Sequence, residues 1–404
     1  MKLVIQQGTF NKSRNIEEYE VDNVIEMIKA NYYGERIDPL PYELARFRIP
    51  NGVAVIYYDN RKVRTRNYWY EVRGLSALAK YLGLNFYHSV PKEFRDGQLT
   101  EIDGIDVESE TKMIELKQTK IPQKWIDFLE NKRARLGIKE CYICAPSFDE
   151  NIKIPEAVRV FKINLDINTL KDYYNKEFKL PEWFSPYISN RHVRFLLSNG
   201  LWYGIKRKLT KTAKHTENTK ILQNINLIFK RRKQPIRIYY SLSRMAIPQR
   251  DFYGKGYPLS HIMAAFDVDS DHKPHIIGSK GFCEKCLEQA KPKRDLLEEI
   301  LLDLGYDVEI IHSGFKGYHL YCLDDDGFPV ELSVKEIQDL LPKLRDYNDN
   351  PLTDNENFRG QDGSFDLHRI FKLPNTIDVV TGIRVSKKLE RLKFEDQIQE
   401  IERS

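Results

Sequence analysis

Apolar and polar residues alternate along the first 165 residues in patterns that change between strand and helix. The stretch 53–58 is a continuous apolar run typical of a strand, whereas 70–82 carries apolar residues at helical spacing and ends at Gly83. The segments 99–107 and 112–117 predict two strands of a hairpin that turns near Ser109. The same criteria predict helices at 17–30 and 122–136 and a further strand at 140–145.

The second half of the chain continues this mixture of strands and helices. In the segment 294–304, residues Leu297, Ile300, Leu301 and Leu304 form one apolar stripe, which predicts a helix. The remaining predicted elements are strands near 193–206, 236–241 and 261–268, a hairpin at 309–323, and helices at 170–179, 334–347 and 387–404. The pattern is typical of an α/β (α+β) protein, and the Pro-, Asn-, Asp- and Lys-rich stretch 146–190 predicts a linker between domains 1–165 and 166–404.

Composition restricts the number of domains and the class of protein but does not indicate an activity. A length of 404 residues with 41% hydrophobic residues is enough for two or three domains. The net charge is only +5, but basic residues concentrate at 206–214 and 230–233 beside aromatic residues, which suits either nucleic-acid binding or a solvated charged face. Five cysteines do not form a disulfide framework, and we see no signal peptide, transmembrane run or lipidation motif, so we expect a cytoplasmic protein.

The strongest chemical pattern is an apolar strand with two aspartates, followed by a glycine-rich segment. Asp267 and Asp269 alternate on the strand and therefore point to the same side, where two carboxylates can bind a divalent cation. The segment 313–319 offers a hydroxyl, a Gly-x-x-Gly loop, a lysine and a histidine, which suits a triphosphate. Together these residues predict nucleotidyl transfer.

These motifs occur in a characteristic order. Phe266-Asp267-Val268-Asp269 is followed by Cys283-Glu284-Lys285-Cys286, then by Ser313-Gly314-Phe315-Lys316-Gly317-Tyr318-His319, and finally by Arg369-Ile370-Phe371-Lys372-Leu373-Pro374 and Thr381-Gly382. In this order the region 236–385 resembles the catalytic small subunit of archaeo-eukaryotic DNA primase, a member of the primase-polymerase superfamily. The resemblance implies a primase catalytic domain with a small zinc knuckle.

The resemblance also implies roles for individual residues. Asp267 and Asp269 would bind Mg²⁺ or Mn²⁺ together with a third aspartate, for which Asp362 and Asp366 are both candidates. The nucleotide would be bound by residues that the family uses for the triphosphate, here Ser313, Lys316, His319 and Lys372. Lysine replaces the family's arginine at 316 and 372, and Asp378 stands where many relatives have histidine.

A structural zinc ion is a further expectation. Cys283 and Cys286 have the spacing of a zinc knuckle, and the resemblance places the other ligands just upstream, at His275 and His272. The alternative is a reduced cysteine pair without metal. The other Cys-x-x-Cys pair, in the predicted strand 140–145, lacks a second ligand pair and is interpreted as part of the core.

The first domain carries a second set of candidate catalytic residues. With the hairpin turning at Ser109, Asp103 lies opposite Glu115, and Lys117 shares their side of the sheet. This arrangement, with Glu71 on the preceding helix, resembles PD-(D/E)xK nucleases, in which two carboxylates bind magnesium and the lysine activates water. The alternatives are a charged hairpin without a site and a nuclease-like fold that only binds DNA.

The sequence therefore predicts a DNA primase or primase-polymerase fused to a nuclease-like domain. Its expected partners are a single-stranded DNA template, nucleoside triphosphates, and a replicative helicase or primase accessory subunit. The alternatives are an end-filling repair polymerase with a nuclease domain and a catalytically vestigial DNA-binding replication protein.

Overall fold

The computed structural model describes most of the chain, in segments separated by gaps. The described residues are 2–7, 14–20, 35–37, 43–49, 52–57, 61–94, 99–189, 191–198, 202–204, 217–231, 234–245, 258–270, 274–353 and 370–402. Their contacts divide the chain into two units. The first unit is 1–165 with the short segments 274–279 and 396–404, and the second is 166–273 with 280–395.

The first unit opens with a five-stranded antiparallel sheet. The strand order is β2-β1-β5-β4-β3, formed by β1 Lys2–Gln7, β2 Arg14–Glu20, β3 Glu35–Ile37, β4 Glu43–Ile49 and β5 Gly52–Tyr57. The prediction of a helix at 17–30 is wrong for its first turn, because residues up to Glu20 pair with β1 as strand β2. Ile16 and Tyr19 have helical spacing, but backbone pairing to a neighbouring strand overrides such a short local signal. Residues 21–30 lie outside the described part.

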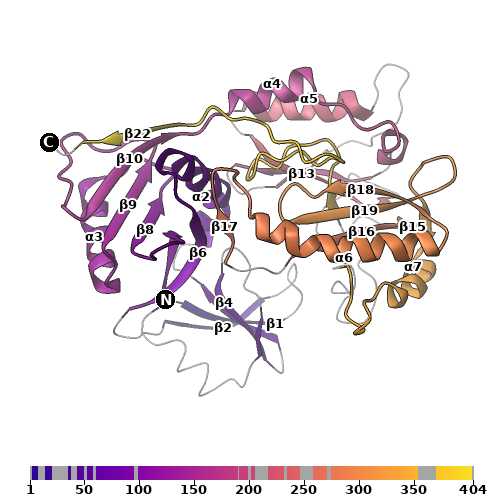
Figure 1. Cartoon of the computed structure of the whole chain (residues 1–404), viewed down its shortest axis with the longest axis horizontal. Coiled ribbons are helices and arrows are strands. Elements are labelled where there is room, and N and C mark those ends of the chain that lie inside the picture. The colour runs from indigo at the N-terminus through magenta and orange to yellow at the C-terminus, as the bar shows by residue number, and fades with distance from the viewer. Residues whose placement is uncertain are drawn as a thin grey trace. The chain divides into compact units, whose positions relative to one another are not determined.

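A seven-stranded mixed sheet forms the larger part of the first unit (Figure 1). Its order is β17-β6-β7-β8-β9-β10-β22, with β8, β9 and β10 parallel. The strands are β6 Phe86–Glu93, β7 Leu99–Asp106, β8 Lys112–Leu116, β9 Glu140–Ala145, β10 Val158–Asn164, β17 Ile276–Ile277 and β22 Gln397–Ile401. The predicted hairpin thus forms as β7 and β8.

The end of the chain corrects a second prediction. A helix was expected over 387–404, but Gln397–Ile401 pairs antiparallel with β10 at the edge of the sheet. The Arg159 guanidinium bonds both carboxylate oxygens of Glu400 across this pairing, at 2.7 Å each. An edge strand offers unpaired backbone groups, so a short charged segment gains more from pairing there than from an isolated helix.

Two helices pack on this sheet. Helix α2, Arg61–Leu82, buries Val72, Leu75 and Leu78, and helix α3, Gln123–Leu136, buries Ile126 and Leu129. The apolar residues of α3 pack with a core that includes Met113 of β8, Ile143 of β9 and Val160 of β10. Helix α3 ends at Gly137, whose φ of 71° suits a residue without a Cβ.

The second unit is built from three small sheets. Their orders are β12-β11-β13-β21, β14-β15-β20 and β16-β19-β18. The strands are β11 Val193–Leu197, β12 Trp202–Gly204, β13 Pro235–Ser241, β14 Ser243–Met245, β15 Pro258–Met263, β16 Ala265–Asp269, β18 Asp307–His312, β19 Gly317–Leu323, β20 Glu331–Ser333 and β21 Ile370–Lys372.

The helices of this unit cover its sheets. Helix α6, Glu284–Asp303, runs along the sheet of β16, β18 and β19, and it starts ten residues before the predicted 294–304 (Figure 1). Leu297 and Leu301 of the predicted stripe are fully buried. The other helices are α4 Asn168–Lys176, which contacts α5 Glu217–Lys230, and α7 Val334–Leu340, with 3₁₀ turns at Ser185–Ile188 and Leu341–Lys343. Within the described residues, no helix is both long and apolar enough to span a membrane.

One buried arginine joins separate segments of the second unit. The guanidinium of Arg191 is 1% exposed and donates to the carbonyls of Tyr187, Ser241 and Leu242 and to the carboxylate of Glu331. The planar fork of arginine can satisfy several acceptors at once, which a lysine ammonium cannot do in the same geometry. This residue therefore ties a 3₁₀ turn, the end of β13 and strand β20 together.

We expect Arg191→Met to destabilise the protein by about 3 kcal/mol or more, because the substitution removes the buried donor that three carbonyls share and leaves Glu331 with Arg244 as its guanidinium partner. Arg191→Lys should recover only a small part of that loss. Thermal unfolding followed by circular dichroism checks this, with the exposed Lys176→Ala as control. Equal melting temperatures for wild type and Arg191→Met would contradict it.

Candidate functional site

Strand pairing in the second unit determines where the two predicted catalytic aspartates lie. Strand β16 runs antiparallel to β19, with Asp267 opposite His319 and Asp269 opposite Gly317. The two carboxylates are about four-fifths buried, since their side chains are 23% and 19% exposed. The carbonyl of Asp267 accepts a hydrogen bond from the Thr353 hydroxyl at 2.9 Å. Both carboxylates thus face one side of the sheet from a fixed backbone.

Glycine is required at two positions of the predicted triphosphate loop. A Cβ on Gly317 would lie 2.0 Å from the carbonyl oxygen of Val268, so a side chain there would push β16 and β19 apart. Gly314 has φ of +81°, and its Cβ would lie 3.0 Å from Cβ of Asp378. The loop is closed by a hydrogen bond from the Ser313 amide to the Gly317 carbonyl at 2.9 Å. Ser313 itself is almost fully buried.

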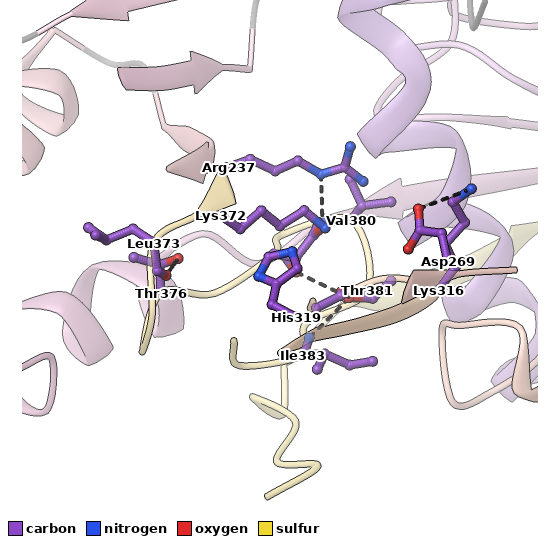
Figure 2. Close-up of polar contacts among 12 residues, drawn as sticks. Arg237, Asp269, Lys316, His319, Lys372, Leu373, Thr376, Val380, Thr381 and Ile383 are labelled. Atoms are coloured by element: carbon purple, nitrogen blue, oxygen red, sulfur yellow. Dashed lines mark hydrogen bonds and ion pairs between the residues drawn. The ribbon is translucent and has the colours of Figure 1, made fainter. Parts of the chain in front are cut away.

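Lysine and histidine contact the aspartates directly. Nζ of Lys316 lies 3.2 Å from Oδ2 of Asp269, and Nε2 of His319 lies 3.7 Å from Oδ1 of Asp267. The imidazole of His319 also stacks on Phe371, with ring centroids 4.5 Å apart. The structure therefore brings Asp267, Asp269, Lys316 and His319 into one cluster, of which Figure 2 labels Asp269, Lys316 and His319.

A second group of charges includes the predicted residue Lys372. Oδ2 of Asp378 accepts from Nζ of Lys372 at 2.7 Å and from Nε of Arg237 at 2.8 Å. Both cations also lie over the ring of Phe315, at 5.7 Å and 5.2 Å from its centroid. Figure 2 shows Arg237 and Lys372 extending side by side, next to the pair of Asp269 and Lys316.

Burial and the neighbouring charges affect the pKa of Lys372 in opposite senses. Burial lowers the pKa of this ammonium, Asp378 raises it, and the nearby Arg237 lowers it, with a net decrease. A carboxylate at 378 therefore favours the protonated form of Lys372.

The geometry is suited to hard cations. Two carboxylates on alternate residues of one strand supply the oxygen ligands that Mg²⁺ and Mn²⁺ prefer. Both candidates for the third carboxylate, Asp362 and Asp366, lie outside the described residues. Their assignment stays a prediction.

The expected zinc ligands lie close together in the sequence. His275, Cys283 and Cys286 each offer one ligand atom, and these atoms lie within 4.8 Å of one another. Cys283 precedes helix α6 and Cys286 lies in its first turn. One imidazole and two thiols are a donor set that suits zinc, which prefers nitrogen and sulfur ligands. His272 lies outside the described residues, so the complete ligand set stays a prediction.

The first unit brings together its own set of predicted residues. Strands β7 and β8 pair with Gly104 opposite Ile114, a register that places Asp103 beside Glu115. Nζ of Lys117 lies 3.2 Å from Oδ2 of Asp103 and 2.9 Å from Oε2 of Glu115. Asp103 also accepts from the Leu116 amide at 2.7 Å. Asp106 at the end of β7 lies apart from this contact: it accepts from Ser109 and from the Lys112 amide, and so stabilises the turn.

A lysine that no sequence motif singles out completes this cluster. Lys132 of α3 is almost fully buried, donates to the Glu101 carbonyl at 2.6 Å, and forms an ion pair with Oε1 of Glu115. Its signal in the sequence is its position in the apolar stripe of α3, three residues after Leu129. Glu71 of α2 lies beside His88, at 3.6 Å between Oε2 and Nε2.

The environments of the two carboxylates separate their pKa values. Burial raises the pKa of Asp103 to about 7, which Lys117 opposes and Glu115 and Glu71 reinforce. For Glu115, burial is outweighed by Lys117 and Lys132, and its pKa falls to about 2. Burial lowers and the two carboxylates raise the pKa of Lys117, with a net increase. Such divergence between neighbouring carboxyl groups is typical of functional sites.

Comparisons with known proteins match part of this chain. No protein family model matches it. A segment is 32% identical over 123 residues to the DNA primase small subunit PriS of Methanocaldococcus jannaschii. The match covers 26% of this chain and 35% of that relative, so the chain spans about a third of the relative's length. Part of the chain is therefore similar to an archaeal primase small subunit.

Among solved structures, the polymerase domain of Mycobacterium tuberculosis ligase D in complex with DNA is matched at 14% identity with a TM-score of 0.28. This match covers 56% of the chain and 79% of that domain.

We expect Asp103→Asn to stabilise the metal-free protein at high pH. The pKa of Asp103 is near 4 in the unfolded chain and near 7 in the folded protein, so ionisation of this group destabilises the fold as the pH rises from 4 to 7. Asparagine does not ionise and therefore causes no such loss. The gain over wild type should grow by about 2–4 kcal/mol between pH 4 and pH 8. Thermal unfolding in EDTA at both pH values measures it. A gain that is the same at both pH values would contradict the assignment.

Proposed function

We propose that this protein is a DNA primase or primase-polymerase that makes short primers from nucleoside triphosphates on single-stranded DNA. The observation that carries this proposal is the pairing of β16 with β19, which sets Asp267 and Asp269 beside Lys316 and His319. The similarity of part of the chain to an archaeal primase small subunit supports it.

The chemistry divides between carboxylates and cations. Divalent cations bound by Asp267, Asp269 and a third carboxylate would supply activation of the primer 3′-hydroxyl and charge neutralisation for the departing pyrophosphate. Lys316 lies at the end of the glycine loop, where its ammonium is placed to exchange Asp269 for a phosphate oxygen. Ser313 and His319 would orient the triphosphate from the same loop and strand.

Lys372 and Arg237 lie next to this cluster on β21 and β13 (Figure 2). An ammonium has three donors, so the bond of Lys372 to Asp378 uses one of them. We assign Lys372 to phosphate binding, with Arg237 as a neighbour that contributes charge. The single-stranded template would be the nucleic-acid partner, with a replicative helicase or primase accessory subunit as a protein partner. A zinc ion at His275, Cys283 and Cys286 would be structural.

We expect the wild-type protein to make short products on unprimed single-stranded DNA with Mg²⁺ or Mn²⁺ and labelled nucleotides. Asp267→Ala/Asp269→Ala should abolish these products, because the substitutions remove two cation ligands at once. Glu115→Ala in the first unit is the matched control and should retain synthesis. In the same assay, Asp362→Ala and Asp366→Ala compared separately identify the third carboxylate.

Two alternatives make different predictions in this assay. An end-filling repair polymerase would extend a supplied primer but start none. A DNA-binding replication protein with vestigial catalytic residues would bind single-stranded DNA without any synthesis. Absence of product from wild type, with and without a primer, would overturn the proposed activity.

A second candidate function belongs to the first unit. The specific observation is the cluster of Asp103, Glu115 and Lys117 at the β7–β8 hairpin, with carboxyl groups whose pKa values lie far apart. We propose that this cluster cleaves DNA in a reaction that depends on a divalent cation. Lys117, whose raised pKa keeps it in the ammonium form, is placed to orient water beside the two carboxylates. The same fold without cleavage would serve as a DNA-binding domain.

We expect Lys117→Ala to lower Mn²⁺-dependent DNA cleavage by about 100-fold or more, since a positioned general acid or base contributes at least that much. Plasmid and labelled single-stranded substrates measure the rate. The Asp267→Ala/Asp269→Ala variant is the control and should cleave like wild type. If cleavage survives Lys117→Ala and Glu115→Ala, or disappears in the control, the cluster of the first unit is not the site of DNA cleavage.

A further inference from the structure

Glu115 is held by two ammonium groups, one on each carboxylate oxygen. Oε2 accepts from Lys117, which comes from the same strand end, and Oε1 accepts from Lys132, which comes from helix α3. The carboxylate is 4% exposed, so solvent takes almost no part in its interactions. A nuclease-like site needs one lysine beside its carboxylates, and the second is left without a role in the proposed reaction.

The two lysines differ in how firmly they are held. The side chain of Lys117 is 25% exposed and divides its contacts between Asp103 and Glu115. That of Lys132 is 9% exposed and bonds a fixed backbone carbonyl, that of Glu101, besides Glu115. A cation that approaches the carboxylates can displace Lys117 toward water. Lys132 cannot move to water in this way, because separation from Glu115 would leave its ammonium buried without a counter-charge.

The contact with Lys132 limits how many oxygens of Glu115 can bind a cation. With Oε1 retained by Lys132, only Oε2 is left to bind next to Asp103. Ca²⁺ takes six to eight oxygen ligands and often binds a carboxylate through both oxygens, whereas Mg²⁺ and Mn²⁺ suit octahedral sites with single carboxylate oxygens and water. A carboxylate restricted to one oxygen favours the smaller cations.

We propose that Lys132 is a positioning residue that limits Glu115 to one cation-binding oxygen and so makes the site of the first unit selective for Mg²⁺ or Mn²⁺ over Ca²⁺. This inference rests on the proposed cation-dependent cluster of Asp103, Glu115 and Lys117. It extends that proposal to the choice of cation.

Isothermal titration calorimetry of the full chain with Mn²⁺ and with Ca²⁺ tests the inference without any cleavage assay. Every protein carries Asp267→Ala and Asp269→Ala, which remove the cation ligands of the second unit. The parent is compared with Lys132→Met, whose unbranched side chain fills most of the same space without a charge. The component of binding that Glu115→Gln abolishes is the quantity compared, and the exposed Lys124→Met on the same helix is the matched control.

We expect Lys132→Met to raise the affinity for Ca²⁺ relative to Mn²⁺ by about tenfold, because Glu115 becomes free to bind through both oxygens. Lys124→Met should keep the parental ratio. Lys132→Gln removes the same charge with a polar side chain and replaces Lys132→Met if circular dichroism shows that the latter does not fold. A parental ratio in the Lys132 variants would overturn the inference alone. Absence of binding that depends on Glu115 in the parent would overturn the proposed cation site as well.

Discussion

The antiparallel pairing of β16 with β19 is the constraint on which the proposed synthesis site depends. This register sets Asp267 beside His319 and Asp269 beside Gly317. The two strands come so close at position 317 that only glycine, which has no side chain, fits there. A shift by one residue would turn both aspartates to the opposite side of the sheet. The glycine loop, the Lys316 contact and the Thr353 hydrogen bond all follow from the pairing.

Both units hold their carboxylates with internal cations. Asp269 is paired with Lys316, Glu115 with Lys117 and Lys132, and Asp378 with Lys372 and Arg237. A buried carboxylate loses hydration, and an ammonium or guanidinium from the same chain compensates for that loss. Such pairs hold the carboxylates in fixed positions. At the proposed sites each pair would be a contact that an incoming cation or phosphate has to exchange, so the strength of the pair would govern which ligands bind.

Some predicted elements agree with the structure and others differ from it, and tertiary contacts account for the differences. The hairpin at β7 and β8 and the buried stripe of α6 follow from local patterns that the sequence displays over many residues. By contrast, residues 17–20 and Gln397–Ile401 were expected as helix and form strands, because each pairs with a strand that the local pattern does not reveal. Short amphipathic segments have weak intrinsic preferences, so a partner backbone decides their conformation.

The sequence by itself determined the chemistry of the candidate sites: the alternate aspartates of β16, the glycines around Lys316, and the carboxylates and lysine at the β7–β8 hairpin. These follow from residue type and spacing within one strand or turn, where geometry is local. Only the tertiary structure decided that Arg237 and Lys372 share Asp378, and that Lys132 enters the cluster at Glu115. Lys132 and Glu115 are 17 residues apart along the chain, and Arg237 and Asp378 are 141 residues apart, so no local rule links them. Burial makes these ion pairs necessary, because a charged group removed from water destabilises the fold unless an opposite charge lies beside it.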